Sequence, residues 1–504
     1  MFSSIKPILL HRVYLALKFS SSSSSRSAVY FALGMLLVYY YLIISINPGD
    51  FQGDAHDYFG IAYLIKKNGL TFSLYSTLRG IGYPLFLALC WGENGILVYI
   101  VQASLFFGAF VWALRTFVGF NIYCILPIAV AAIPSFAFLQ KLLYPDGILM
   151  SLSLVFICSY YTERYALCLL VGIILCLIKL IFIAALGAAA VALILSRWHK
   201  VKLFRTFFVS ASVAGIALFV FTFFMALPDI GYMIAFVRPY AHGYQLNRLL
   251  SDSELRFTCS NTEYHLAQSS FFTEPITTPW AAYPYGPLTA EQATRFGCSM
   301  DDLKKVKLGM IVDAFKKNPW VHLSLAGEFF LKSLVGYPDI RHSAYIIAYK
   351  RATWLERYDN LSYFSPYEAD ALLPQYAKYG FAIEENGPNL VYHINDTSKC
   401  SYENFFRFFI ISLLIFVALA SIATRRFWTD FLDKGNSIII CYMLVYSFLF
   451  TVGGPLIYDR LVYVNMLLSV ILVSRMLTRY SLIVVNRIID SPSFGMSPQK
   501  VASC

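Results

Sequence analysis

The sequence predicts an all-α polytopic membrane protein, with about ten or more transmembrane helices and a mixed extracytoplasmic domain. Hydrophobic residues make up 58% of the 504-residue chain and charged residues only 14%, whereas charged residues are about a quarter of a typical soluble domain. Several stretches of about 15 to 25 residues carry almost no charge, and a helix of this kind crosses a hydrocarbon core of about 30 Å. A transmembrane β-barrel would show short alternating strands instead.

The net charge of +11 is associated with lysines and arginines that gather in short loops between the apolar segments. The positive-inside rule expects this distribution in a polytopic membrane protein. No RNA- or DNA-binding motif accompanies the basic residues. The sequence therefore indicates membrane lipids, and no nucleic acid, as partners.

The alternation of apolar and charged segments divides the chain into five parts. These are a cytoplasmic tail (1–27), an N-terminal transmembrane module (28–227) with an outer loop at 47–94, an extracytoplasmic region (228–402), C-terminal transmembrane helices (403–478) and a second cytoplasmic tail (479–504). The candidate spans lie near 28–46, 95–114, 122–140, 147–161, 166–180, 181–195, 204–227, 405–423, 437–454 and 460–474. This order puts the basic turns inside, which include Arg115, Glu163 with Arg164, Arg425 with Arg426, Arg475 and Arg479.

Four further segments do not fit a simple crossing. Residues 82–91 are apolar but too short to span, so they predict a helix at the outer surface. Residues 166–195 are too long for one crossing and predict two short helices packed inside the bundle. Residues 302–317 and 320–335, separated by an Asn-Pro pair, predict two helices on or near the membrane surface.

The outer loop places acidic residues directly after the first span, in the sequence GDAHDY. Asp54 and Asp57 are three residues apart and would share one face of a helix. A carboxylate at a membrane edge can accept a proton from a hydroxyl group or coordinate a divalent cation. The structural alternative is that Asp54 caps a helix that begins near Ala55.

Other outward-facing positions add charge to the same face of the bundle. Arg79 precedes a Gly-Ile-Gly-Tyr-Pro segment, Asp146 begins one span, and Arg460 begins another. Acidic and basic groups on one face suit a reaction between a hydroxyl acceptor and an anionic, lipid-held donor, because an arginine offsets charge on a departing phosphate. Each position also has a structural alternative: a helix cap for Asp146, snorkelling for Arg460, an internal ion pair for Lys179, and an aromatic belt for Tyr58, Tyr83 and Tyr144.

These motifs resemble those of a known family. The stretch GDAHDY…A…NGLTFS…TLRGIGYPLFLAL (53–89) looks like the first outer loop of GT-C superfamily glycosyltransferases, in particular of bacterial polytopic members related to protein mannosyltransferases and to the lipid A aminoarabinose transferase. The segment YPDGILMSLSLVFICSYY (144–161) is similar to the second outer acidic site of that family. NPW (318–320) and YDRLVYVNMLLSVIL (458–472) resemble later landmarks.

The resemblance implies an inverting glycosyltransferase. Its donor would be a polyprenyl-phosphate-linked sugar, and its acceptor a hydroxyl group of a glycan, glycolipid or protein on the extracytoplasmic face. Asp54 would be the general base, and Asp146 would orient the acceptor or the base. The implied substrate-binding residues are Asp57, Tyr58, Arg79, Tyr83, Lys179, Tyr458 and Arg460, of which Arg79, Lys179 and Arg460 would hold the lipid phosphate.

This chain departs from the family at one point. Many relatives have adjacent Asp and Glu residues where this chain has Asp54-Ala55. The resemblance therefore implies no certain cofactor and leaves open whether a divalent cation, Mg²⁺ or Mn²⁺, binds. A bacterial inner (plasma) membrane is favoured over the endoplasmic reticulum membrane as the location.

Three other kinds of membrane protein compete with this interpretation. An O-antigen polymerase or ligase typically relies on paired arginines in its large outer loop, and the arginines of region 228–402 form no clear pair. A transporter or flippase of lipid-linked sugars predicts inverted repeats around a midplane site, and no such symmetry is present in the sequence. A non-catalytic assembly scaffold would tolerate loss of Asp54.

Overall fold

The computed structural model describes residues 23–46, 55–69, 80–90, 96–140, 144–179, 185–189, 231, 233–241, 256–259, 262–265, 299–335, 433–453 and 459–489, with a few helical positions between 411 and 429. These residues are predominantly helical, as predicted. Within them, one pair of strands forms an antiparallel hairpin, β1 (Arg256–Cys259) with β2 (Thr262–His265).

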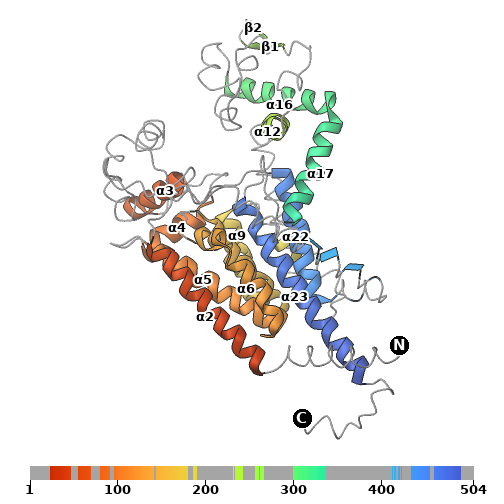
Figure 1. Ribbon diagram of the computed structural model, residues 1–504. Coiled ribbons are helices and arrows are strands. Elements are labelled where there is room, and N and C mark those ends of the chain that lie inside the picture. The colour runs from red at the N-terminus through yellow and green to blue at the C-terminus, as the bar shows by residue number, and fades with distance from the viewer. Residues whose placement is uncertain are drawn as a thin grey trace.

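Seven helices form a bundle of inclined, neighbouring rods (Figure 1). They are α2 (Ser23–Ile46), α5 (Ile96–Ala113), α6 (Ile125–Ala131), α8 (Asp146–Tyr161), α9 (Tyr165–Ile178), α22 (Lys434–Gly453) and α23 (Asp459–Ile489). A π-helical turn, η2 (Leu114–Val118), continues α5, and the short elements η3 (Ile122–Cys124) and α7 (Pro134–Leu139) flank α6. The remaining elements are α3 (Ala55–Asn68), α4 (Gly82–Leu89), η5 (Met233–Val237), α12 (Arg238–Ala241), α16 (Met300–Lys317) and α17 (Pro319–Val335).

Two helical segments in the described part of the chain, Ser24–Ser45 and Leu97–Val118, are long and apolar enough to cross a membrane. Four shorter helical segments are also apolar: Ile122–Ala131, Asp146–Tyr161, Tyr165–Ile178 and Lys434–Leu449. The expectation of ten or more transmembrane helices stays a prediction. The predicted span 204–227 and most of 181–195 and 405–423 lie outside the described residues.

Two predicted spans differ from the helices that form. Residues 122–140 break into η3, α6 and α7, because Pro134 lacks the N–H group that would continue the helix. The span expected at 460–474 is part of the longer helix α23, which continues to Ile489. The break expected within 166–195 does occur, since α9 ends at Ile178 and residues 185–189 are helical again.

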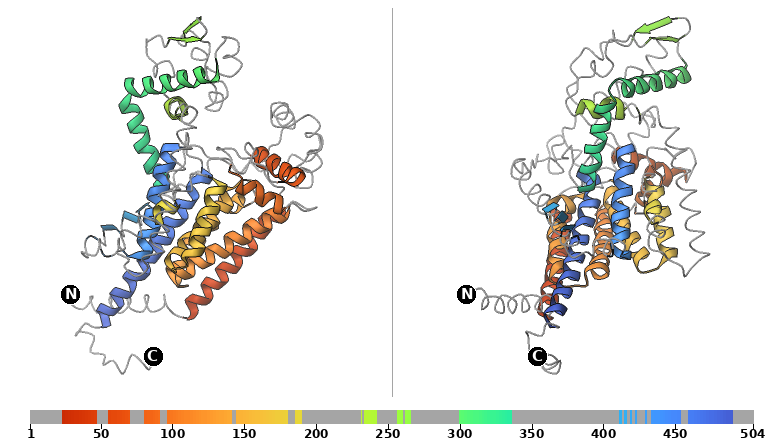
Figure 2. Two further views of the ribbon diagram at one scale, coloured as in Figure 1. Left: turned by 180° about the vertical axis from the view of Figure 1, so that it is seen from behind. Right: turned by 90° about the vertical axis from the view of Figure 1, so that its right-hand side faces the viewer.

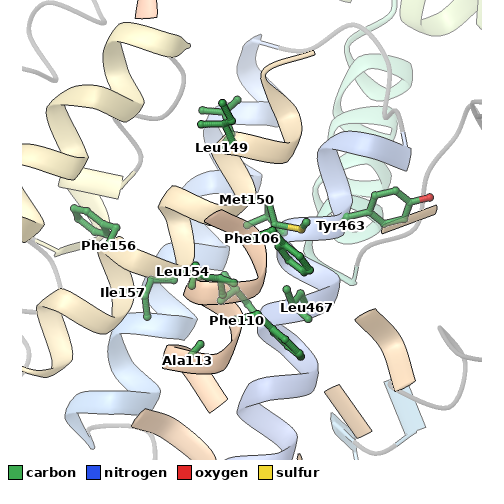
Figure 3. Close-up of a cluster of buried hydrophobic side chains, with 14 of the residues drawn as sticks. Phe106, Phe110, Ala113, Leu149, Met150, Leu154, Phe156, Ile157, Tyr463 and Leu467 are labelled. Atoms are coloured by element: carbon green, nitrogen blue, oxygen red, sulfur yellow. The ribbon is translucent and has the colours of Figure 1, made fainter. Parts of the chain in front are cut away.

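The core of the bundle lies where α5, α8 and α23 meet (Figure 3). Phe106 and Phe110 of α5 stack with their ring centroids 5.7 Å apart. The hydroxyl groups of Ser153 in α8 and Tyr442 in α22 lie 2.6 Å apart, which joins a fourth helix to the core. Ser151 and Ser153 of α8 also donate to carbonyls of their own helix, which satisfies these buried hydroxyl groups.

Large apolar side chains cover part of the outside of the bundle. On α2, the side chains of Phe31, Met35, Val38 and Leu42 are 50–72% exposed and recur every three or four residues. On α9, Leu170, Ile173 and Leu177 are 45–55% exposed at the same spacing. These two helices therefore each present an apolar stripe away from the core.

The helices outside the bundle gather at one of its ends. Figures 1 and 2 show α3, α4, α12, α16 and the hairpin at this end, where α17 descends from α16 to α22 and α23. Arg238 of α12 donates to the Thr451 carbonyl of α22 at 2.7 Å and lies over the Phe329 ring of α17. The Asn465 amide of α23 donates to the carbonyl of Ser333 in α17 at 2.8 Å. Side-chain hydrogen bonds thus join the outer elements to the bundle.

The opposite end of α22 carries a network of paired charges. Arg475 donates to Asp433 at 2.7 Å and to the Asn436 side chain at 3.0 Å, and Lys434 donates to Glu163 at 2.7 Å. Burial raises the pKa of Asp433, but the hydrogen bond and charge of Arg475, with the charge of Arg479, outweigh burial and hold that pKa below its ordinary value of 3.8. Residues that the sequence assigns to the inner surface therefore meet at one end of the bundle.

Candidate active site at the starts of α4 and α8 and the end of α9

The first charged pair of the site is Asp146 with Lys179. Asp146 begins α8, yet the capping position belongs to Pro145 and no side-chain cap forms. Instead, the Asp146 carboxylate lies 4.0 Å from Lys179 Nζ; Asp146 is 4% exposed and Lys179 is 28% exposed. No side-chain cap precedes α8, whereas the contact with Asp146 matches the internal ion pair that is the structural alternative for Lys179.

Lys179 occupies the point at which α9 stops. Its backbone is extended, with φ −154° and ψ 116°, so α9 ends at Ile178. The last carbonyl groups of an α-helix have no partner within the helix, and those of α9 face the start of α4. The broken helix therefore brings a cation and backbone oxygens to the same place.

Two glycines allow α4 to approach the end of α9. A methyl group at Gly80 would overlap the carbonyl oxygens of Leu177 and Ile178, and one at Gly82 would lie 2.8 Å from Ile178 Cγ1. Only a residue without Cβ permits this backbone contact. The glycines of the Arg-Gly-Ile-Gly-Tyr-Pro segment thus have a packing function that the sequence did not indicate. Arg79 directly precedes Gly80 but lies outside the described residues.

Two tyrosines and two glutamines connect α3, α4, α5 and α7. The Tyr83 hydroxyl donates to Gln102 Oε1 at 2.9 Å, and Gln102 Nε2 donates to the Gln140 carbonyl at 2.8 Å. The Tyr58 ring meets the Tyr83 ring edge-on, with centroids 5.3 Å apart. Both tyrosines are buried, so neither lies at an exposed interface as an aromatic-belt residue would. Sequence reasoning missed both glutamines.

The other predicted site residues are only partly described. Asp54 directly precedes α3, but Asp54 and Tyr458 lie outside the described residues. Asp57 lies in the first turn of α3 and Arg460 in the first turn of α23, although the positions of their side chains are not described. Tyr144, two residues before α8, is 3% exposed and therefore buried. In Figure 1, α3 and the start of α23 lie toward the end of the bundle that α17 approaches.

The described side chains do not fit a divalent cation at Asp146. Its ionic partner is the ammonium group of Lys179, whereas Mg²⁺ binds several oxygen ligands. Within the described ranges, no group of three or more His, Cys, Asp or Glu residues could hold a metal ion. A cation at Asp54 and Asp57 stays a prediction, because their side chains are outside the described residues.

The arrangement combines a buried carboxylate, a partly exposed cation and buried amide and phenol groups. A carboxylate can accept hydrogen bonds or a proton from hydroxyl groups, and an ammonium group can bind a phosphate. Comparisons with family models, with curated proteins and with solved structures find no match for this chain. The function is therefore argued from the motifs of the sequence and from this geometry.

Proposed function

We propose that the protein is an integral-membrane glycosyltransferase of the GT-C type. It transfers a sugar from a polyprenyl-phosphate donor to a hydroxyl group of a glycan, glycolipid or protein on the extracytoplasmic face. The proposal includes a multi-pass topology of about ten or more transmembrane helices and a location in a bacterial inner membrane. The exposed apolar stripes on α2 and α9 support a lipid-facing surface, because apolar patches of this kind are rare on soluble monomers.

The observation that carries the proposal is the ion pair of Asp146 with Lys179 at the broken end of α9. Its carboxylate is buried while its ammonium group is partly exposed, so the cation can approach an anionic ligand from the open side. Ionisable residues within membrane-spanning segments are costly even when paired and are commonly functional. Gly80 packs against the same helix end.

The proposed reaction is a single displacement at the anomeric carbon. The acceptor oxygen attacks this carbon while the bond from the carbon to the phosphate oxygen breaks, which inverts the configuration. Asp54 takes the proton of the acceptor hydroxyl as general base. Polyprenyl phosphate leaves with the electron pair of the broken bond, and Lys179, Arg79 and Arg460 offset its charge. Asp146 orients the acceptor or the base.

A transfer assay tests the proposal directly. The purified protein in lipid nanodiscs is incubated with undecaprenyl phosphate carrying glucose, galactose, mannose or 4-amino-4-deoxyarabinose, together with glycan, glycolipid and peptide acceptors. The expected products are free undecaprenyl phosphate and an acceptor glycoside of inverted configuration, observed by mass spectrometry and NMR. Lack of release from every donor, or retention of configuration, would contradict the proposal.

The break in α9 also suits a transporter of lipid-linked sugars, since transporters use discontinuous helices at their binding sites. The two functions differ in their products. A transporter moves the sugar-lipid to the other leaflet with its glycosidic bond intact, whereas the transferase releases undecaprenyl phosphate. Movement of an intact, fluorescent sugar-lipid across proteoliposomes without release would favour the transporter.

A further inference from the structure

Gln140 has a buried side chain that the interactions described above do not use. The residue is 0% exposed, and neither Nε2 nor Oε1 has a hydrogen-bond partner within the described part of the chain. Gln102 offers a contrast, because its amide bonds both to Tyr83 and to the Gln140 carbonyl. A buried carboxamide without partners is destabilising. Such a group calls for an explanation, and one explanation is a ligand.

The Gln140 amide lies against the first turn of α8, beside Asp146. A methyl group at Gly147 would be 2.9 Å from Gln140 Oε1 and 3.0 Å from the Leu139 carbonyl oxygen. Gly147 directly follows Asp146, so the absence of a side chain at Gly147 leaves room for the amide against the turn that carries Asp146. The neighbouring backbone carbonyl of Gln140 is held in place by Gln102, which fixes the base of the side chain.

We propose that Gln140 and Asp146 together form a subsite for neighbouring hydroxyl groups of a sugar ring. The carboxamide can donate and accept hydrogen bonds, whereas the carboxylate only accepts them. Adjacent hydroxyl groups can do both, so they can bond to the two side chains at once. A sugar hydroxyl group carries no net charge, so it can bond to Asp146 while Lys179 binds the phosphate of the donor. The sugar reaches the subsite beside Lys179, the exposed side of the cluster.

This inference rests on the proposed function for its choice of ligand, and it adds Gln140 as a residue that recognises the sugar. The test is equilibrium binding to the full chain in nanodiscs. The probes are the four undecaprenyl-phosphate sugars named above, unglycosylated undecaprenyl phosphate, and methyl glycosides of the same sugars. The variant is Gln140→Met, which keeps the length of the side chain and removes its polar atoms. Ser151→Ala in α8 is the control, because Ser151 bonds to the Gly147 carbonyl of its own helix.

The variant separates recognition from a structural role. Replacing an unpartnered buried amide by an apolar group of similar shape is neutral or stabilising, so Gln140→Met should keep or raise the apparent melting temperature. It should also lower the affinity for the sugar-lipid that binds best by about tenfold, since one or more hydrogen bonds are lost. Binding of unglycosylated undecaprenyl phosphate should not change, and Ser151→Ala should bind every probe as the wild type does.

Each outcome supports or overturns the inference. Weaker binding of sugar-lipids alone assigns the subsite to the donor sugar, and weaker binding of methyl glycosides alone assigns it to the acceptor; both support the inference. The inference would be overturned if Gln140→Met bound every probe with wild-type affinity. It would also be overturned if the variant lost affinity equally for all probes and melted at a lower temperature, or if the wild type bound no sugar. A chain that binds sugar-lipids through Gln140 but transfers nothing would contradict only the proposed transferase activity.

Discussion

Substituting Gly80 by alanine should separate α4 from α9. The added methyl group would overlap two carbonyl oxygens at the end of α9 and would lie 2.6 Å from the Ile178 carbonyl carbon. Backbone atoms cannot rotate away as a flexible side chain can. The two segments must therefore move apart by roughly 1 Å, a shift of the kind that overpacking causes.

The magnitude follows from the contacts that this shift would disturb. Overpacking costs about 1–3 kcal/mol. Loss of the buried Tyr83–Gln102 hydrogen bond, which begins one residue beyond Gly82, adds about 0.5–1.5 kcal/mol. The total of about 1.5–4.5 kcal/mol corresponds to a fall of roughly 1–4 °C in apparent melting temperature for a chain of 504 residues. Transfer activity should fall as well, because the segment after Arg79 no longer meets the end of α9.

Thermal denaturation followed by fluorescence-detected size-exclusion chromatography measures this change. Gly108→Ala is the matched control, since Gly108 lies in α5 with no atom within 4 Å of an added methyl group. Alanine is favoured over glycine within a helix by about 0.5–1 kcal/mol, so this variant should match or exceed the wild type. An unchanged melting temperature in Gly80→Ala would refute the argument that α4 and α9 require backbone contact.

Substitutions at three further residues test other parts of the structure. Asp433→Asn should lower the free energy of unfolding by about 1–3 kcal/mol. Because the pKa of Asp433 is depressed, the stabilisation by its carboxylate is full above pH 3.8 and is lost as the pH falls through the folded pKa. The melting temperatures of the wild type and the variant should therefore converge in acid. Convergence at pH 7 instead would show that the bond to Arg475 contributes nothing. Tyr83→Phe leaves Gln102 Oε1 without its donor and should cost about 1–3 kcal/mol, measured by thermal denaturation; equal stability would contradict the buried hydrogen bond. Lys179→Met should raise KM for the polyprenyl-phosphate donor about tenfold while Lys179→Arg retains most binding, and an unchanged KM would remove the lysine from the phosphate site.

Much of the helical framework could be predicted from the sequence. The end of α16 at Lys317 follows from the Asn-Pro pair after it, and the interruption of 166–195 follows from its excessive length. Both are local signals, because proline and segment length act on their own part of the chain. The length of α23 could not be predicted in this way, since its C-terminal part is polar enough to resemble a tail and its Arg475 is held by contacts with distant residues.

The candidate site shows a similar division. The charges of Asp146 and Lys179 could be singled out because charge is rare in apolar segments. Gln140 could not, because a single amide in an apolar stretch forms no pattern, and its burial depends on how α7 and α8 meet. The packing function of Gly80 could not be predicted either, because its close contact is with the backbone at the end of α9, which is distant in sequence.

The central claim is that the carboxylate of Asp54 accepts the proton of the acceptor hydroxyl. The most direct measurement is the initial rate of undecaprenyl phosphate release by the wild type, Asp54→Asn and Asp57→Asn at equal amounts of folded protein in nanodiscs. The account predicts a loss of about 10²–10⁴ for Asp54→Asn and a much smaller loss for Asp57→Asn. A wild-type rate in Asp54→Asn would contradict the account.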